Sequence, residues 1–129
     1  MQVQNRLRCS REYAQVYRRK QVHVNKYLVM YIKPNGLDVT RFGFSVSKKV
    51  GKSVVRNRYR RRLKELCRRH LDQLEKGYDV VLVARPAAVN VNHEKLQRAL
   101  RHLFHAAGLF GAKREKKLGK GTAEYGTGD

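Results

Sequence analysis

Closely spaced basic side chains dominate the middle of the chain, between residues 48 and 62. Guanidinium groups at such short intervals gain bidentate partners only from phosphates or carboxylates. Like charges one helical turn apart destabilise a helix by roughly 0.2–0.5 kcal/mol per pair, so a helix that needed only solubility would mix both signs. We therefore interpret the stretch as a phosphate-binding surface rather than a solvated basic helix or a localisation signal. The predicted contact residues are Lys48, Lys49, Lys52, Arg56, Asn57, Arg58, Arg60, Arg61 and Arg62.

A second group of candidate side chains is mainly aromatic. Val16 and Tyr17 follow Tyr13 at spacings of three and four, so the three residues share one face of a predicted short helix. Rings on such a face ordinarily pack against a sheet, and that packing is one interpretation. Rings at the edge of the face can also stack on unpaired bases. The candidates for a groove that holds a single strand are Tyr13, Tyr17, Tyr31, Phe44 and Ser45.

The sequence predicts no catalytic and no metal-binding residues. A nuclease would gather carboxylates around magnesium or place histidines as acid and base, whereas the acidic residues here are scattered. His93, His102 and His105 lie on or beside the last predicted helix without a partnering carboxylate or a third ligand nearby, so a structural role is expected rather than catalysis. The GKS at 51–53 lacks the preceding glycine of a nucleotide-binding loop. The chain is interpreted as a binding protein.

The overall charge favours nucleic acid as the partner. The 129 residues contain 30 Lys and Arg against 10 Asp and Glu, a formal net charge of +20, and such a chain repels itself unless a polyanion is bound. No apolar run approaches the roughly 18 residues of a membrane span, and the N-terminus lacks a signal-peptide core. We expect a soluble, cytoplasmic protein in which Cys9 and Cys67 are buried, reduced thiols.

Hydrophobic periodicity and turn signals predict one α+β domain, a two-layer sandwich in the order α-β-β-β-α-β-α. The length allows one modest core. The domain is expected to cover residues 1–110, followed by a disordered tail rich in glycine and lysine at 111–129. The elements are a helix from Ser10, strands at 21–24, 27–32 and 40–47, a basic helix closed by 75–77, a strand at 78–85 and a helix ending at Gly108.

Several details of the predicted sheet and helices follow from local signals. The PNG turn at 34–36 predicts that strands 27–32 and 40–47 form an antiparallel pair. The apolar run at 78–85 indicates an interior or parallel strand, and Asn90 or Asn92 is expected to cap the last helix. The core stripe of the basic helix is predicted to contain Val55, Tyr59, Leu63, Leu66, Cys67, His70 and Leu74.

The chain resembles the bacterial ribonuclease P protein family. The signature is RFGFSVSKK at 41–49, running into GKSVVRNRYRRRL at 51–63. Supporting matches are SREY at 10–13, YDVVLVARP at 78–86 and LRHLF at 100–104, so the resemblance covers residues 5 to about 107 in the right order. Two positions that are phenylalanine in other members are Tyr13 and Tyr17 here.

The resemblance implies a function and a fold. Members are the non-catalytic protein subunit of an endoribonuclease that removes the 5′ leader from precursor tRNA, and one protein binds one catalytic RNA subunit. That RNA performs hydrolysis with Mg²⁺, which is bound mainly by the RNA and not tightly by the protein alone. The basic helix would bind the RNA subunit, and the aromatic cleft would bind the unpaired leader. The four-stranded sheet would contain a left-handed βαβ crossover.

Two other functions remain open at this stage. A ribosomal protein or general RNA chaperone would share the charge and the single domain but would need no organised aromatic cleft. An autonomous endonuclease would require an acid and a base, which the sequence does not supply.

Overall fold

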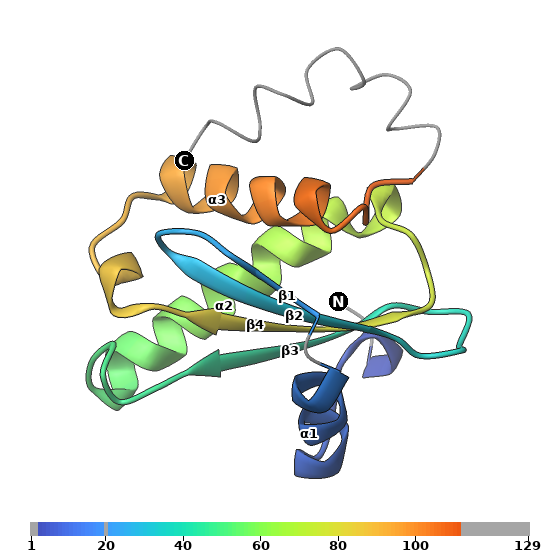
Figure 1. The fold of residues 1–129 in the computed structure, drawn as a ribbon. Helices are drawn as coiled ribbons and strands as arrows, with labels where there is room; N and C mark the ends of the chain where they lie inside the picture. Colours follow the sequence, from blue (N-terminus) through green and yellow to red (C-terminus); the bar gives the residue numbers. More distant parts are fainter. Residues whose placement is uncertain (1–2, 20, 112–129) are drawn as a thin grey trace.

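The computed structural model describes residues 3–19 and 21–111 (Figure 1). Helix α1 (Ser10–Arg19) is followed by strands β1 (Val22–Val24), β2 (Leu28–Pro34) and β3 (Arg41–Val46), helix α2 (Ser53–His70), strand β4 (Tyr78–Ala84) and helix α3 (His93–Ala106). Short 3₁₀ turns lie at Val3–Asn5, Leu71–Gln73 and Pro86–Ala88. The predicted fold class and order of elements are confirmed. The predicted tail begins at Gly111, whose backbone N–H donates to Gln73, and its other residues lie outside the described part of the chain.

The four strands form one mixed sheet in the order β1-β2-β4-β3. β4 is antiparallel to β2 and parallel to β3, which confirms its predicted interior position. The predicted pairing of β2 with β3 is wrong, because β4 lies between them. The turn after β2 contacts the beginning of β4 instead: the N–H of Asn35 donates to Gly77, and its side-chain amide donates to Asp79.

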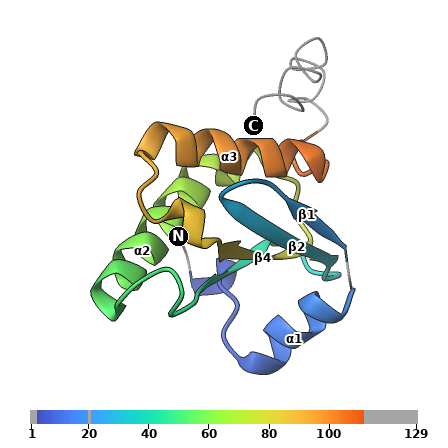
Figure 2. The same ribbon diagram turned by 60° about the vertical axis from the view of Figure 1, so that its left-hand side comes forward.

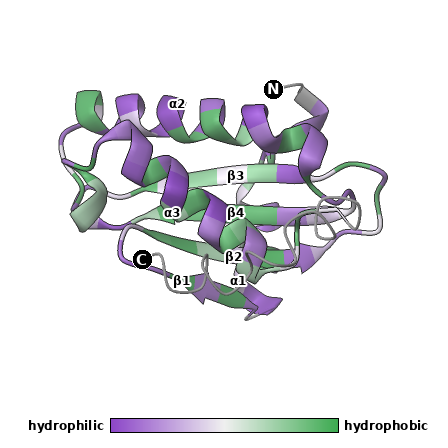
Figure 3. Ribbon diagram, turned by 90° about the horizontal axis from the view of Figure 1, so that it is seen from above, coloured by the Kyte–Doolittle hydropathy of each residue, from purple (hydrophilic) through white to green (hydrophobic). Residues whose placement is uncertain are grey.

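The connection from β3 through α2 to β4 is left-handed, as the family resemblance implied. Figure 3 looks onto the side of the sheet that α2 and α3 cover, and Figure 1 shows β3 and β4 pointing the same way. If Figure 3 is turned so that β3 and β4 point upward, β4 lies to the left of β3, and the connecting helix α2 lies on the viewer's side of the sheet. This is the rare hand for a parallel crossover.

The face of the sheet beneath α2 and α3 carries the main core. Alternate residues of each strand point to this side, including Met30 of β2, Phe42 of β3 and Leu82 of β4, all buried. Leu63 and Leu66 of α2 are fully buried against them, which confirms the centre of the predicted stripe. Figure 3 shows the hydrophobic residues of the strands below the two helices, while much of α2 is hydrophilic.

Helix α1 lies alone on the opposite face (Figures 1 and 2). Val16 is its one buried residue and packs with Leu7 and Val81. The other residues packed against this small cluster are only partly buried, among them Tyr13 and Tyr31. The face beneath α2 and α3 is therefore shielded from solvent, and we call it the closed face. The face beneath α1 is covered only in part, and we call it the open face.

Two helix ends differ from or refine the sequence prediction. The basic helix ends at His70 rather than near Gly77, because a 3₁₀ turn intervenes before Leu74, which is buried and bridges to Phe110. In α3 the side chain of Asn92 accepts a hydrogen bond from the N–H of Lys95 at 2.8 Å, so Asn92 and not Asn90 is the N-cap. Gly108 follows the helix with a φ of 72°, as its predicted terminating role requires.

Candidate nucleic-acid interface

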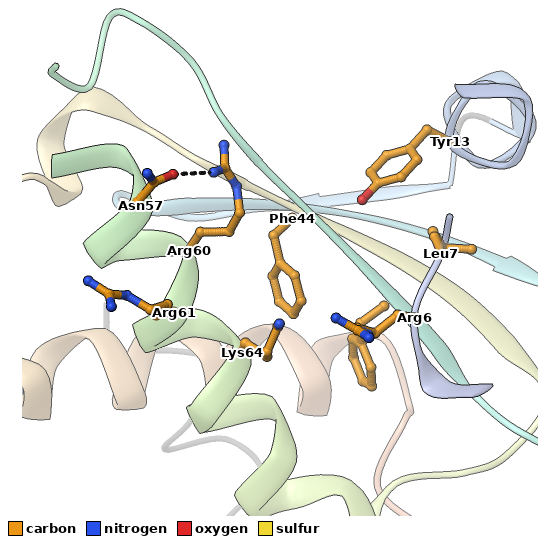
Figure 4. A pocket seen from close by; sticks show the side chains of 9 residues that line it. Arg6, Leu7, Tyr13, Phe44, Asn57, Arg60, Arg61 and Lys64 are labelled. Carbon is orange, nitrogen blue, oxygen red and sulfur yellow. Dashed lines mark hydrogen bonds between the residues drawn. The ribbon is translucent and has the colours of Figure 1, made fainter. Parts of the chain in front are cut away.

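A line of four polar side chains on α2 faces the edge of β3. Asn57, Arg60, Arg61 and Lys64 are spaced at i, i+3, i+4 and i+7, so they lie on one side of the helix. We call these four residues the α2 stripe. The Arg60 guanidinium donates a 2.8 Å hydrogen bond to the Asn57 side-chain oxygen (Figure 4). Asn57 and Arg61 are exposed, while Arg60 and Lys64 are partly exposed, so the stripe presents three cations to a polyanion.

The other predicted arginines of α2 lie in different surroundings. Arg62 is partly buried, donates a 3.3 Å hydrogen bond to the carbonyl of Val91, and stacks over the Tyr59 ring at 5.4 Å. It thereby ties α2 to the loop before α3. Arg58 is exposed, whereas Arg56 is half-buried with no hydrogen-bond partner for its Nε. The structure therefore brings Asn57, Arg60 and Arg61 together and places Arg62 on a different side of the helix.

Three exposed lysines lie in the turn between β3 and α2. They are Lys48, Lys49 and Lys52. Lys52 occupies the N-cap position of α2, and its side chain makes no capping hydrogen bond. The N-terminus of α2 thus follows directly after three exposed lysines, and helix N–H groups together with nearby cations favour phosphate oxygens.

The predicted tyrosines meet beneath α1. The rings of Tyr17 and Tyr31 lie edge to face with centroids 4.7 Å apart. Partial burial raises the pKa of Tyr17, while a hydrogen bond with the Ser45 side chain acts in the opposite direction. Tyr17 is still 37% exposed. The structure therefore brings Tyr17, Tyr31 and Ser45 together on the α1 side of the sheet, where the Tyr17 ring remains partly exposed.

Tyr13 reaches the same side of the sheet over Gly43 of β3. A Cβ atom at Gly43 would lie 2.5 Å from Cε2 of the Tyr13 ring, so the absence of a side chain lets the phenol approach the strand. Phe44 is placed differently from the tyrosines. It packs against the core on the α2 side, with its ring parallel to that of Phe42 at 6.4 Å and 12°. Of the five predicted groove residues, Phe44 is the one that points to the other face.

An ion cluster that the sequence analysis missed fixes α1 to the sheet. Arg41 donates to both oxygens of Asp79 at 2.8 and 2.7 Å and to Glu12 of α1 at 2.9 Å. The Asp79 side chain is only 3% exposed. The hydrogen bonds with Asp79 raise the pKa of Arg41. The backbone N–H of Arg8 donates a hydrogen bond to the Glu12 carboxylate and thereby lowers the pKa of Glu12. Arg41 and Asp79 are adjacent only through the parallel register of β3 and β4, which the local sequence does not contain.

The remaining titratable residues offer little to catalysis. Within residues 3–19 and 21–111, no three His, Cys, Asp or Glu side chains are grouped so that they could hold a metal ion. Cys67 is buried as predicted, and burial raises the pKa of its thiol. Cys9 was predicted to be buried, but it lies on the surface just before α1 and is exposed. In this same part of the chain, none of the helices combines the length and apolar character that a bilayer-crossing segment needs.

A cavity of about 410 Å³ lies where α2, β3 and the N-terminal segment meet. Its lining includes the α2 stripe and also Arg6, Leu7, Tyr13, Phe42 and Phe44. Figure 4 shows Phe44 between Lys64 and Arg60 of α2 on one side and Tyr13 of α1 on the other. Arg6, Leu7, Phe42 and Lys64 were not predicted as site residues. Lys64 could have been found, because it completes the i, i+3, i+4, i+7 pattern.

Comparison with known proteins identifies the family. The family model described as Ribonuclease P matches residues 1–108. A ribonuclease P protein component from Clostridium botulinum (strain Langeland) is 43% identical over 108 residues, covering 83% of this chain and 97% of that protein. One from Alkaliphilus oremlandii is 39% identical and covers 84% of this chain and 96% of its own.

Solved structures agree with the sequence comparisons. The RNase P protein of Staphylococcus aureus superposes with a TM-score of 0.77 at 28% identity, covering 83% of this chain and 98% of that one. The protein from Thermotoga maritima gives a TM-score of 0.70 at 29% identity, with 76% and 94% coverage. These matches extend over most of the described domain. The chain therefore belongs to the bacterial ribonuclease P protein family and is an RNA-binding protein component of this tRNA-processing endoribonuclease.

Proposed function

We propose that the chain binds the catalytic RNA subunit through the basic surface of α2 and holds the unpaired 5′ leader of precursor tRNA in the aromatic cleft beneath α1. The observation that carries the proposal is the separation of two surfaces on one small domain. The cations of the α2 stripe lie on one side of β3, and the Tyr17–Tyr31 pair lies on the other face of the sheet. A single protein can thus contact two RNA molecules at once.

The division of labour follows from the chemistry of each surface. Arginines and lysines neutralise phosphates of folded RNA without reading its sequence. Tyrosine rings provide stacking faces that unpaired bases reach and paired bases do not. The protein would therefore favour tRNA that still carries its leader, while the RNA subunit would perform hydrolysis with the Mg²⁺ that it mainly holds. One protein would serve one RNA subunit, in the cytoplasm.

Reconstitution with the cognate RNA subunit tests the proposal. Added protein should increase cleavage of precursor tRNA at low Mg²⁺, and RNA recovered with the purified protein should be one species of a few hundred nucleotides. Recovery of ribosomal RNA, with no effect on cleavage, would favour a ribosomal protein or a general RNA chaperone. Cleavage by the protein after exhaustive removal of RNA would contradict the proposed subunit role.

The α2 surface has its own test with a matched control. Arg60→Ala combined with Arg61→Ala should weaken binding of the RNA subunit, and the log-log salt slope should shrink by roughly 0.7–0.9 for each phosphate that is no longer neutralised. Arg68→Ala combined with Arg69→Ala removes the same charge from the same helix, but these arginines pair with Glu65. A similar change of slope in both double variants would show that total charge, and not the stripe, governs binding.

A further inference from the structure

The cavity between the α2 stripe and β3 is lined by both aromatic rings and cationic side chains. Four of its nine lining residues are cationic, namely Arg6, Arg60, Arg61 and Lys64, and none is acidic. Tyr13, Phe42 and Phe44 contribute aromatic rings, and Asn57 contributes an amide. Its volume of about 410 Å³ falls within the roughly 300–1,000 Å³ that is usual for small-molecule sites.

Phe44 packs against the core on one side and is accessible on the other. Its ring lies parallel to that of Phe42, which is 1% exposed and in turn meets Phe104 of α3 edge to face at 6.3 Å. Phe44 itself is only partly buried. One side of the ring is therefore fixed by the core, while the cavity gives access to the rest of it. A ring that is already ordered loses little entropy when a base stacks on it.

The edge of β3 leaves this ring accessible. β3 is the last strand of the sheet, and the N-terminal segment pairs with its edge at Phe42, where the N–H of Leu7 donates to the Phe42 carbonyl at 2.9 Å. The chain then turns away into α1 at Ser10. Two residues further along β3, Phe44 faces Lys64 and Arg60 across the cavity (Figure 4).

We propose that this cavity binds one unpaired RNA nucleotide, with its base stacked on Phe44 and its phosphate held by Arg60, Arg61 and Lys64. The Arg60 guanidinium donates a hydrogen bond to the Asn57 side-chain oxygen, and both residues line the cavity. The inference rests on the proposed function and adds a base-binding site to a surface that otherwise contacts phosphates alone. The nucleotide belongs either to the RNA subunit or to the leader of precursor tRNA.

Phe44→Leu tests the site because it keeps an apolar contact with Phe42 and removes the aromatic face. Two affinities are measured for the full chain: for the RNA subunit alone, and, as holoenzyme, for tRNA with and without its leader. The expected loss is roughly 5- to 150-fold, the range for stacking on one base. The salt slope should stay unchanged, because the ring neutralises no phosphate. Tyr78→Leu is the control, since Tyr78 is another half-buried ring on the same core outside the cavity.

The two arms locate the nucleotide. A loss for the RNA subunit assigns it to that RNA, and a loss confined to leader-bearing tRNA assigns it to the leader. Wild-type affinities on both arms for Phe44→Leu, or an equal loss in Tyr78→Leu, would overturn the site. Failure of the wild-type chain to bind either RNA would instead contradict the proposed function.

A second experiment uses a fluorine label on the Phe44 ring, which hardly changes the size of the side chain. With 4-fluorophenylalanine in place of Phe44, the ¹⁹F resonance of the full chain should shift when a five-nucleotide oligoadenylate is added. It should shift much less with an abasic strand of the same length and charge. Equal shifts for the two strands would mean that the ring senses phosphate binding and not a base, which also overturns the site.

Discussion

The two faces of the sheet differ in how much of their surface is closed. Beneath α2 and α3, the side chains of Phe42, Leu63 and Phe104 are almost completely buried in one large cluster. Beneath α1, the buried cluster in the described part of the chain is formed by Val16, Leu7 and Val81, and the tyrosines packed against it remain partly exposed. Hydrophobic burial is therefore concentrated on one side. The other side retains aromatic surface that a ligand can use, so we expect stability and leader binding to depend on different residues.

The largest expected effect is on stability, at the closed face. Leu63→Ala removes methyl groups from a fully buried position, and the free energy of unfolding should fall by about 2–5 kcal/mol. Val16→Ala at the open face removes fewer carbon atoms from a smaller cluster and should cost less. Urea denaturation of both variants measures the difference. Equal losses would mean that the two faces contribute similarly to stability.

The next effect is on leader binding, at the open face. Tyr17→Ala removes a ring that contacts Tyr31 and is 37% exposed. Stacking is worth roughly 1–3 kcal/mol per base, so holoenzyme affinity for leader-bearing tRNA should fall by roughly 5- to 150-fold. Affinity for leaderless tRNA should barely change.

The folding control for Tyr17→Ala is the unfolding curve of the free protein, which should shift less than that of Leu63→Ala. Equal losses of affinity for leader-bearing and leaderless tRNA would assign Tyr17 to the structure or to the RNA-subunit contact. Leader binding could then no longer be assigned to Tyr17 and the open face of the sheet.

A smaller effect is expected where Tyr13 approaches β3. In Gly43→Ala the new Cβ would lie 2.5 Å from the Tyr13 ring, but the clash is with the outer end of a side chain that can swing aside. Stability should therefore change little, and affinity for leader-bearing tRNA should fall by only part of the stacking energy. In a double-mutant cycle, Gly43→Ala should add almost nothing to Tyr13→Ala. Additive losses would show that Gly43 acts independently of Tyr13.

The sequence predicted those features that depend on local periodicity. Strict alternation places Phe42, Phe44 and Val46 on one side of β3 and Gly43 and Ser45 on the other. Alternation alone does not say which side is the core, so Phe44 was grouped with the tyrosines although it packs on the opposite face. The side that carries Phe42, Phe44 and Val46 is the core side because α2 packs against it. No local pattern in the strand specifies which of its sides a helix will cover.

Long-range pairing explains what the sequence could not predict. A turn after β2 suggested a hairpin, but β4 pairs with β2 along seven residues and separates it from β3. The Arg41–Asp79 pair, which joins residues 38 positions apart, exists only because of that strand order. The α2 core stripe was predictable because it requires no partner to be identified. The end of α2 at His70 was not predictable, because the chain continues in a 3₁₀ turn at Leu71–Gln73 whose residues would also fit an α-helix.

The smallest effect is expected on the solvent side of α2, which belongs to neither face. Glu65 is the one acidic residue of that helix. Its hydrogen bonds with Arg68, assisted by Arg69, lower its pKa from 4.5 to about 2. Because the pKa is lower in the folded state, the pair's small stabilisation is present above about pH 4.5 and disappears as the pH falls toward 2. Glu65→Gln should therefore melt slightly below wild type at neutral pH, and the difference should vanish as the pH falls through about 2.

The same variant distinguishes the α2 stripe from the helix as a whole. Glu65→Gln raises the net charge by one and releases Arg68 and Arg69 from their carboxylate partner. If the RNA subunit contacts only the side formed by Asn57, Arg60, Arg61 and Lys64, the released arginines meet no phosphate, and the salt slope of binding should equal that of wild type. A slope that is steeper by about one or more would mean that phosphates also reach the side carrying Arg68, and the RNA-binding surface would have to be extended around the helix.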